Sequence, residues 1–245
     1  MRILWVAALA ALVGLCGPAL AADDPPNLTT EQIEQIVHAY LVKNPEVVVE
    51  ALQAYERKMA DAQTRSADQA MSDMAAQIYG DPETPETGNP EGDVVIVEFF
   101  DYRCGYCRHS APDIFALLRE DPNVRFIYKE FPILGPGSVV AARAALAARE
   151  QGLYQPFHEA LMTADIDFSE ASVMALAEQI GLDTEQLKVD MEDPKIRSHI
   201  EATYELAEAL GIRGTPAFII GGELIPGALD RAELDKLVAE TRGSS

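Results

Sequence analysis

Two cysteines three residues apart, Cys104 and Cys107, are the residues whose types and spacing most clearly indicate chemistry. They enclose Gly105 and Tyr106, follow an apolar run at 94–100 and precede a stretch with helical spacing. A cysteine in the first turn of a helix faces unpaired backbone N–H groups, which lower the pKa of its thiol. The second cysteine lies within one turn, close enough to form a disulfide with the first. The motif predicts a dithiol redox centre, with Cys104 as nucleophile and Cys107 as resolving thiol.

A cysteine pair can also bind a metal ion or form a structural disulfide. Zinc sites need about four ligands, and the chain has no second cysteine cluster, so we predict no metal centre. A purely structural disulfide across so short a loop would remove little chain entropy. A competing interpretation is that the pair binds Cu(I), which soft thiolates select, in a copper-sequestering or chaperone protein that is not an enzyme.

The N-terminus has the pattern of a cleaved signal peptide over residues 1–21. Arg2 precedes an apolar stretch at 3–15, and Ala19-Leu20-Ala21 fits the usual small-residue cleavage site. Cleavage would remove Cys16, which leaves only the two motif cysteines in the mature chain. We therefore expect an exported, periplasmic protein that carries a reactive pair and no other thiol.

Composition narrows the choice of partners. The chain has 245 residues and a formal net charge of −21. Nucleic-acid binding is disfavoured because phosphate contacts need clustered Lys and Arg. Beyond the leader, no stretch is long and apolar enough to suggest a membrane span.

Residues 22–80 are predicted to form an N-terminal helical region. Thr29 and Gln32 have capping-box spacing, and a second helix is expected from Asn44-Pro45 to about Tyr79. Its apolar positions are spaced 4-3-4-3 and then shift phase by one residue. The first set is Val48, Leu52, Tyr55, Met59 and Ala62, and the second is Ala67, Met71, Met74 and Ile78. Such a seam packs either on the chain's own catalytic domain or on other copies, and we favour self-association into a dimer or trimer.

The remaining chain predicts an α/β domain. Residues 81–90 have the composition of a linker, and two parallel strands are expected at 94–100 and 124–129, joined by the helix after the cysteines. A helical insertion follows at 138–211. A hairpin and a final helix then complete a domain built from 91–137 and 212–245.

This order of elements resembles the DsbA family of thioredoxin-fold disulfide oxidoreductases. The resemblance is carried by three segments, Glu98–Cys107, Tyr128–Pro132 and Gly214–Phe218. The N-terminal helices are similar to those of oligomeric ScsC-like members. The resemblance implies a thioredoxin fold with an inserted all-helical domain, preceded by a helical oligomerisation arm.

The resemblance also implies roles for residues outside the motif. Thr215-Pro216 matches the cis-proline loop, so Thr215 and Pro216, with Gly105 and Tyr106, are expected to contact the substrate backbone. Glu98 and Lys129 match a pair that lies beneath the cysteines and assists proton transfer at Cys107. The alternative is that Glu98 and Lys129 are two side chains whose charged ends reach solvent.

The residues between the cysteines bear on the direction of the reaction. Gly105-Tyr106, with Thr215 before the proline, is similar to the disulfide isomerase DsbC, whereas DsbA itself carries Pro-His. This implies a weaker oxidant that acts as an isomerase or reductase, with a dithiol oxidase as the alternative. Arg108 and His109 either lower the pKa of Cys104 or are exposed first-turn residues.

The same resemblance implies the partners. The substrates would be unfolded or misoxidised exported proteins. A membrane redox partner would be either a DsbD-like reductant or a DsbB-like oxidant. No cofactor is expected beyond the Cys104–Cys107 disulfide.

Overall fold

The structure, a computed structural model, describes residues 28–243. The predicted signal peptide at 1–21 lies outside these residues. The chain divides between Lys58 and Met59 into two compact units.

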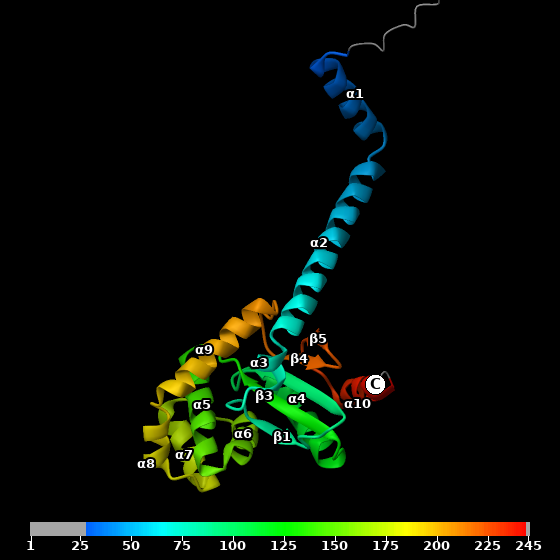
Figure 1. The fold of residues 1–245 in the computed structure, drawn as a ribbon. Helices are drawn as coiled ribbons and strands as arrows, with labels where there is room; N and C mark the ends of the chain where they lie inside the picture. Colours follow the sequence, from blue (N-terminus) through cyan, green and yellow to red (C-terminus); the bar gives the residue numbers. More distant parts are fainter. Residues whose placement is uncertain (1–27, 244–245) are drawn as a thin grey trace, which may run out of the picture. The chain divides into compact units, whose positions relative to one another are not determined.

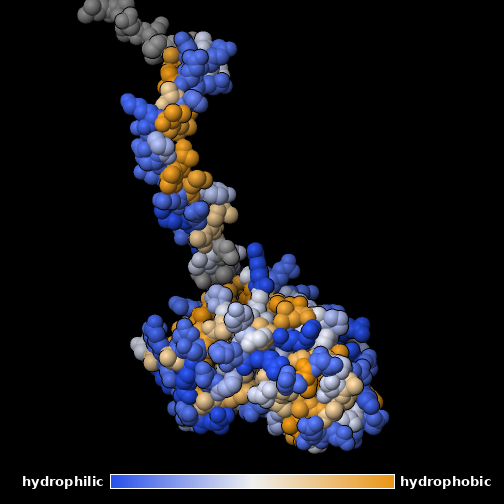
Figure 2. Space-filling model, turned by 180° about the vertical axis from the view of Figure 1, so that it is seen from behind, coloured by the Kyte–Doolittle hydropathy of each residue, from blue (hydrophilic) through white to orange (hydrophobic). Residues whose placement is uncertain are grey.

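The first unit consists of helices whose apolar side chains face solvent. Helix α1 (Thr30–Lys43) begins at a capping box between Thr29 and Gln32, as predicted, and α2 (Glu46–Asp73) follows. No residue of α1 is buried. Figure 2 shows a band of apolar side chains along these helices. Its exposed members in this unit include Ile33, Ile36, Val37, Tyr40, Val48, Leu52 and Tyr55.

The second unit is built on a five-stranded mixed sheet in the order β1-β3-β2-β4-β5 (Figure 1). The central strands β2 and β3 are parallel, and every other pair is antiparallel. Both central strands are buried on both faces, which explains their nearly continuous apolar sequence. The strands are β1 (Glu86–Gly88), β2 (Val94–Phe100), β3 (Val124–Glu130), β4 (Ala217–Ile220) and β5 (Glu223–Pro226).

Helices cover both faces of this sheet. Helix α4 (Gly105–Glu120) and helix α10 (Arg231–Gly243) contribute to the core on one face. On the other face lie α3 (Ala75–Tyr79) and the C-terminal part of α9 (Pro194–Ala209). The helical insertion comprises α5 (Pro136–Ala147), a 3-10 turn (Ala148–Gln151), α6 (Tyr154–Thr163), α7 (Glu170–Ile180), α8 (Thr184–Asp190) and α9. The predicted fold class, a thioredoxin fold with a helical insertion, is confirmed.

Two predictions about residues 44–90 were wrong in detail. The second helix does not run to Tyr79, because the backbone of Met74 (φ −105°, ψ 12°) leaves the helical region and α3 starts afresh. The predicted linker at 81–90 contains β1, which pairs with the edge of β3. This three-residue strand has no apolar alternation of its own, so the open edge of β3 determines it rather than local propensity.

The phase shift in the apolar pattern now has a physical explanation. Ile78 is fully buried against the sheet, and Met71 and Met74 are half-buried beside it. Leu52 and Tyr55 stay exposed. Met71, Met74 and Ile78 thus pack on the sheet of the second unit, whereas most apolar side chains of the first unit are exposed. The side chain of Ala67 lies outside the described residues.

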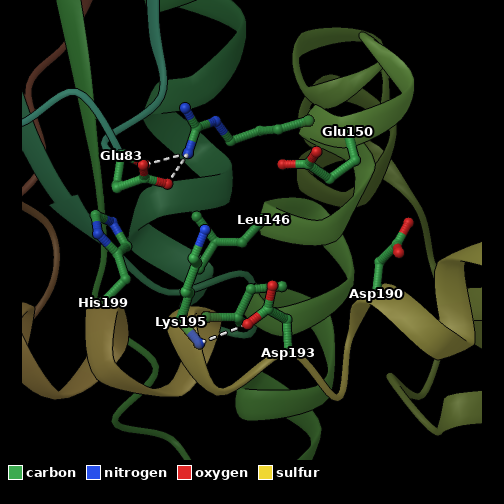
Figure 3. Close-up of a pocket in the computed structure, with 9 residues that line it drawn as sticks. Glu83, Leu146, Glu150, Asp190, Asp193, Lys195 and His199 are labelled. Carbon is green, nitrogen blue, oxygen red and sulfur yellow. Dashed lines mark hydrogen bonds and ion pairs between the residues drawn. The ribbon is translucent and has the colours of Figure 1, made fainter.

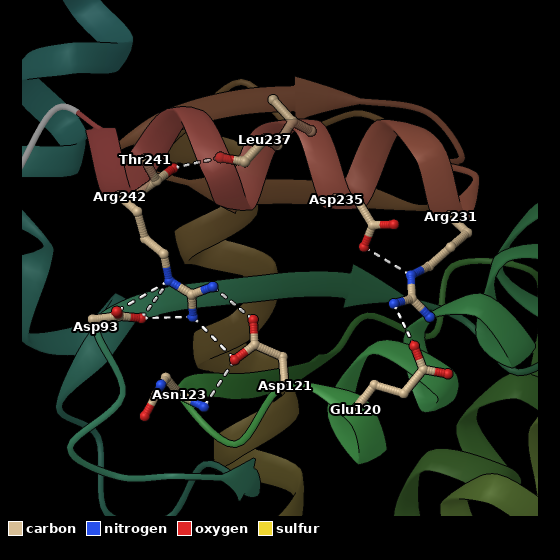
Figure 4. A network of polar contacts seen from close by, with 9 residues as sticks. All are labelled: Asp93, Glu120, Asp121, Asn123, Arg231, Asp235, Leu237, Thr241 and Arg242. Carbon is tan, nitrogen blue, oxygen red and sulfur yellow. Dashed lines mark hydrogen bonds and ion pairs between the residues drawn. The ribbon is translucent and has the colours of Figure 1, made fainter.

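Ion pairs connect α10 to the ends of β2 and α4 (Figure 4). The Arg242 guanidinium contacts Asp93 at 2.8 Å and Asp121 at 2.7 Å, which joins the end of α10 to the residue before β2 and to the end of α4. Arg231, at the start of α10, contacts Glu120 at 2.6 Å. The hydrogen bond from Arg242 holds the pKa of Asp121 below its usual value.

We predict that Arg242→Met lowers the free energy of unfolding by about 1 kcal/mol at pH 7, because it removes a bidentate ion pair but keeps the aliphatic stem. Since Asp121 has a lowered pKa in the folded state, its contribution is lost as pH falls, and the difference should shrink below about pH 4. Urea unfolding at pH 7 and pH 3 measures this. Lys236→Met is the matched control, since Lys236 makes one contact at 3.8 Å. An equal loss at both pH values would contradict the prediction.

Candidate active site

Cys104 lies where the carboxyl end of β2 turns into α4. It is the N-cap residue of α4 with an extended backbone (φ −74°, ψ 115°), and only 6% of its surface is exposed. Cys107 lies in the first turn of the same helix and is fully buried. Both are free thiols. The predicted arrangement of the pair at a helix N-terminus is therefore present.

The surroundings of Cys104 favour its thiolate. Its pKa is lowered to about 5, chiefly by a hydrogen bond from the Cys107 thiol, which outweighs burial. The side chain of Thr215 and the backbone amides of Cys107 and Tyr106 lower it further. These amides belong to the first turn of α4, where helical N–H groups have no intrahelical acceptor. A thiol with this pKa is ionised at neutral pH, and the thiolate is the form of cysteine that acts as a nucleophile.

Cys107 has the opposite character. Burial raises its pKa far above the ordinary range, and its hydrogen bond to Cys104 and the nearby Glu98 carboxyl raise it further. Of the two thiols, only Cys104 is therefore ionised at neutral pH. Cys107 can act only after a base has taken its proton.

Glu98 is a buried carboxyl group whose charge is coupled to both cysteines. It lies on β2 with 2% of its surface exposed, and its Oε1 atom has no hydrogen-bond partner. Burial, with the charge of Cys104, raises the pKa of Glu98 to about 8. A buried carboxyl oxygen without a partner is costly, so its coupling to the two cysteines indicates a functional position.

The predicted Glu98–Lys129 pair is wrong. In the parallel register, Glu98 lies opposite Tyr128, and Lys129 is the neighbour of Phe99. Successive side chains of a strand point to opposite faces, so Lys129 faces away from Glu98. Its ammonium group donates instead to the Gln77 carbonyl oxygen at 2.7 Å and to Thr84 Oγ1 at 2.9 Å.

The predicted cis-proline loop faces the nucleophile. The Thr215-Pro216 peptide bond is cis, and the Thr215 carbonyl oxygen lies 3.2 Å from Cys104 Sγ. Tyr106 is 71% exposed, and a side chain at Gly105 would meet no atom within 4 Å. These positions leave room for a substrate beside Cys104, and their role in binding it stays a prediction.

Arg108 and His109 differ in their surroundings. Arg108 donates to the Ala164 carbonyl oxygen, and its guanidinium carbon lies 5.7 Å from the ring centre of Phe168. His109 is exposed. Arg108 is therefore a link between α4 and the helical insertion.

Two further acidic residues, Asp101 and Glu130, were not predicted as site residues, although both are about 1% exposed and lie close to the motif in sequence or in space. The Asp101 carboxylate accepts hydrogen bonds from the backbone amides of Arg103 and Leu134. Glu130 accepts hydrogen bonds from two tyrosines. An ionisable residue at the end of an apolar strand was the available signal in each case.

A polar hollow of about 230 Å³ lies elsewhere in the second unit (Figure 3). It is lined by residues 83, 146, 149, 150, 190, 193, 195, 196 and 199, and contains neither cysteine.

None of the helices among residues 28–243 is both long enough and apolar enough to cross a bilayer.

Comparison with known families agrees with this geometry. The model of the DSBA-like thioredoxin domain matches residues 95–239, which include both cysteines and the cis-proline loop. The chain belongs to the DsbA-like thioredoxin family. It is thus a thioredoxin-like member of a family of oxidoreductases. A second model, the N-terminal domain of copper resistance protein ScsC, matches residues 30–62 in the exposed helices.

Solved members of this group resemble the chain over most of its length. A thioredoxin-like oxidoreductase from Silicibacter pomeroyi is 48% identical, with a TM-score of 0.67, over 69% of this chain and 98% of that one. Proteus mirabilis ScsC is 30% identical, with a TM-score of 0.67, over 88% of this chain and 97% of that one. A periplasmic thioredoxin-like protein from Salmonella enterica is 32% identical, with a TM-score of 0.64, over 69% of this chain and 96% of that one.

Curated relatives include longer proteins. The Na(+)/H(+) antiporter NhaA 3 of Salinispora tropica is 29% identical over 145 residues. These residues make up 58% of this chain but 22% of the antiporter. The likeness therefore covers less than a quarter of the antiporter's length.

We predict that Cys107→Ala raises the pKa of Cys104 by between about one and two units, the worth of one hydrogen bond to a charged group. The rate of iodoacetamide alkylation between pH 4 and 9 measures this shift. Ser110→Ala, on the same buried side of α4, is the control for loss of a small buried group. An unchanged titration in Cys107→Ala would show that the helix terminus alone stabilises the thiolate.

Proposed function

We propose that this chain is a periplasmic thiol–disulfide oxidoreductase that acts on disulfides of exported proteins, chiefly as an isomerase or reductase. Thiol–disulfide exchange is supported by the position of Cys104 at the start of α4, where its pKa is lowered to about 5 and the Thr215-Pro216 cis peptide lies beside it. The isomerase or reductase role is supported by Gly105-Tyr106 between the cysteines. The cleaved-leader pattern at 1–21 supports export.

The reaction begins with attack of the Cys104 thiolate on a substrate disulfide. The Cys104 sulfur forms a bond to one substrate sulfur, and the other leaves as a thiolate. In isomerisation, a substrate thiolate then attacks the mixed disulfide and releases Cys104. In reduction, Cys107 loses its proton and attacks Cys104 Sγ, which leaves the substrate reduced by two electrons and the Cys104–Cys107 pair oxidised. A DsbD-like reductant would restore the dithiol.

Glu98 is suited to take the proton from Cys107 at the right moment. While Cys104 is a thiolate, its charge helps to raise the pKa of Glu98 to about 8. In the mixed disulfide, Cys104 carries no charge, so the pKa of Glu98 falls and its carboxylate becomes available. The base is therefore ready when Cys107 must attack.

We predict that Glu98→Gln slows resolution of a mixed disulfide by about 10²-fold, the usual contribution of a general base. Quenched-flow release of a peptide from its mixed disulfide with Cys104 measures this rate. Because a raised folded-state pKa lowers stability as pH rises from about 4.3 through 8, Glu98→Gln should also be more stable than wild type at pH 8. If Glu98→Gln is stably folded and resolves the mixed disulfide at the wild-type rate, Glu98 is not the base.

The exposed apolar side chains of α1 and α2 support self-association, which distinguishes isomerases that hold one client among several active sites. A dimer or trimer would bury Leu52, Tyr55 and their neighbours, which are more than half exposed in the single chain.

We predict that Leu52→Asp converts an oligomer into a monomer, because it puts a charge into the shared seam. Light scattering should show the fall in mass, and recovery of scrambled ribonuclease should fall on the order of tenfold, while reduction of insulin stays unchanged. Ala54→Asp adds the same charge at another exposed position of α2 and should change neither property. A monomeric wild type, or full isomerase activity in monomeric Leu52→Asp, would contradict the proposal.

A dithiol oxidase is the second candidate, and the thiolate itself favours it. A pKa of about 5 stabilises the reduced pair and makes the disulfide more oxidising. Equilibrium with glutathione separates the two candidates. A strongly oxidising potential, together with reoxidation by a DsbB-like partner, would favour the oxidase.

A further inference from the structure

The turn that carries Cys104 is held by the segment that follows β3. Phe131 donates its backbone amide to the Phe100 carbonyl oxygen at 2.9 Å. The Leu134 amide donates to the Asp101 carboxylate at 2.9 Å, and the Arg103 side chain donates to the Leu134 carbonyl oxygen at 2.6 Å.

A buried carboxyl group makes a further contact with the turn. Glu130 Oε1 accepts a hydrogen bond from the Tyr102 hydroxyl at 2.9 Å and another from the Tyr154 hydroxyl at 3.0 Å. The Tyr102 hydroxyl also lies 3.0 Å from His158 Nδ1. Glu130 and His158 are 1% exposed, and Tyr102 is equally enclosed. Burial keeps His158 neutral, with its pKa lowered to about 3, so its Nδ1–H can donate while Tyr102 donates to Glu130.

We propose that Glu130 is a positioning residue for Cys104, and that it acts through Tyr102. Tyr102 is two residues before Cys104, and the Cys104 amide closes the turn by donating to the Asp101 carbonyl oxygen at 3.0 Å. With the Tyr102 ring fixed, the Cys104 sulfur stays within reach of the backbone amides of α4 and of the Thr215 side chain. The proposal rests on the thiol–disulfide exchange proposed above.

The simpler interpretation is that the cluster only fills the core. Its composition argues against this, because a hydrogen-bonded carboxyl, imidazole and two hydroxyls cost more to bury than apolar side chains of the same volume. A fully hydrogen-bonded buried network can hold its side chains in a single conformation. Here the network includes Tyr102, which lies two positions before Cys104.

The same carboxyl links the helical insertion to the active site. Tyr154 belongs to α6, so one oxygen of Glu130 joins the insertion to the turn. Tyr204 of α9 donates to the Pro132 carbonyl oxygen at 2.7 Å, which adds a second contact to the same segment. The insertion thereby helps to set the position of Cys104 without containing any residue of the pair.

Full-length Tyr102→Phe, Glu130→Leu and Glu130→Gln test the proposal. Absorbance of the reduced proteins at 240 nm gives the pKa of Cys104, and equilibration with glutathione gives the stability of the disulfide. Tyr102→Phe and Glu130→Leu should raise the pKa of Cys104 and increase the oxidised fraction, by a factor of about three to ten in the equilibrium constant, the size of one hydrogen bond. Glu130→Gln keeps an acceptor for both tyrosines and should stay within twofold of wild type.

Thr203→Val is the matched control, because it removes a buried hydroxyl that bonds the His199 carbonyl oxygen at 3.1 Å, away from the motif. It should lower the melting temperature without changing the Cys104 titration. If Tyr102→Phe and Glu130→Leu also lose only stability, Glu130 is structural and the proposal fails. It fails equally if Glu130→Gln shifts the titration as far as Glu130→Leu, because charge rather than the hydrogen bonds would then be responsible.

Two outcomes separate this inference from the proposed function. If Glu130→Leu does not fold, Tyr102→Phe, which removes a single oxygen atom, decides the inference by the same criteria. If wild type does not exchange with glutathione, the proposed function fails. The differences in thiol titration between wild type, Tyr102→Phe and Glu130→Gln still decide the role of Glu130.

Discussion

Cys104 is a buried residue, and its pKa is lowered to about 5 only because hydrogen-bond donors surround its sulfur. The Cys107 thiol and the first amides of α4 supply them, and together they outweigh the cost of burial. β2 delivers the chain to that point, and α4 begins there. The remaining features of the site, from the cis peptide at Thr215-Pro216 to the buried Glu98, are arranged around this one charge.

The two cysteines of the motif therefore have distinct tasks that follow from position alone. Cys104 has a lowered pKa and keeps 6% of its surface exposed, while Cys107 is fully buried and its pKa is raised. A reduced pair of this kind attacks a substrate disulfide through Cys104, and Cys107 can displace the substrate from the resulting mixed disulfide only after it loses its proton. The coupling between the charge of Cys104 and the pKa of Glu98 gives the order of those events a physical cause.

Strong local signals were read correctly from the sequence. The Thr29 capping box, the parallel strands β2 and β3, and the helix after the cysteines each follow from spacing and capping chemistry. The sharpest error concerned Lys129. Its sequence distance from Glu98 carries no information on strand register, and a shift of one residue reverses the face. The register places Glu98 opposite Tyr128, which sends Lys129 to the other side of the sheet.

Tertiary context determined what sequence pattern alone did not. The edge strand β1 exists because β3 offers unpaired backbone groups. The apolar phase shift after Ala62 reflects a change of surroundings, because Leu52 and Tyr55 face solvent whereas Ile78 is buried in the core. The sequence contained an indication of the role of Glu130, because an ionisable residue stands at the end of a strand that is buried on both faces. Its partners, Tyr102 and Tyr154, come from distant elements and are visible only in the fold.

Thiolate absorbance at 240 nm of the reduced protein without residues 1–21, followed from pH 3 to pH 10, tests the central claim most directly. The structure predicts one thiolate per chain that forms with a midpoint near pH 5, and no second thiolate below pH 10. A midpoint near 8.5, the value of an ordinary cysteine, or two thiolates that form together, would contradict it.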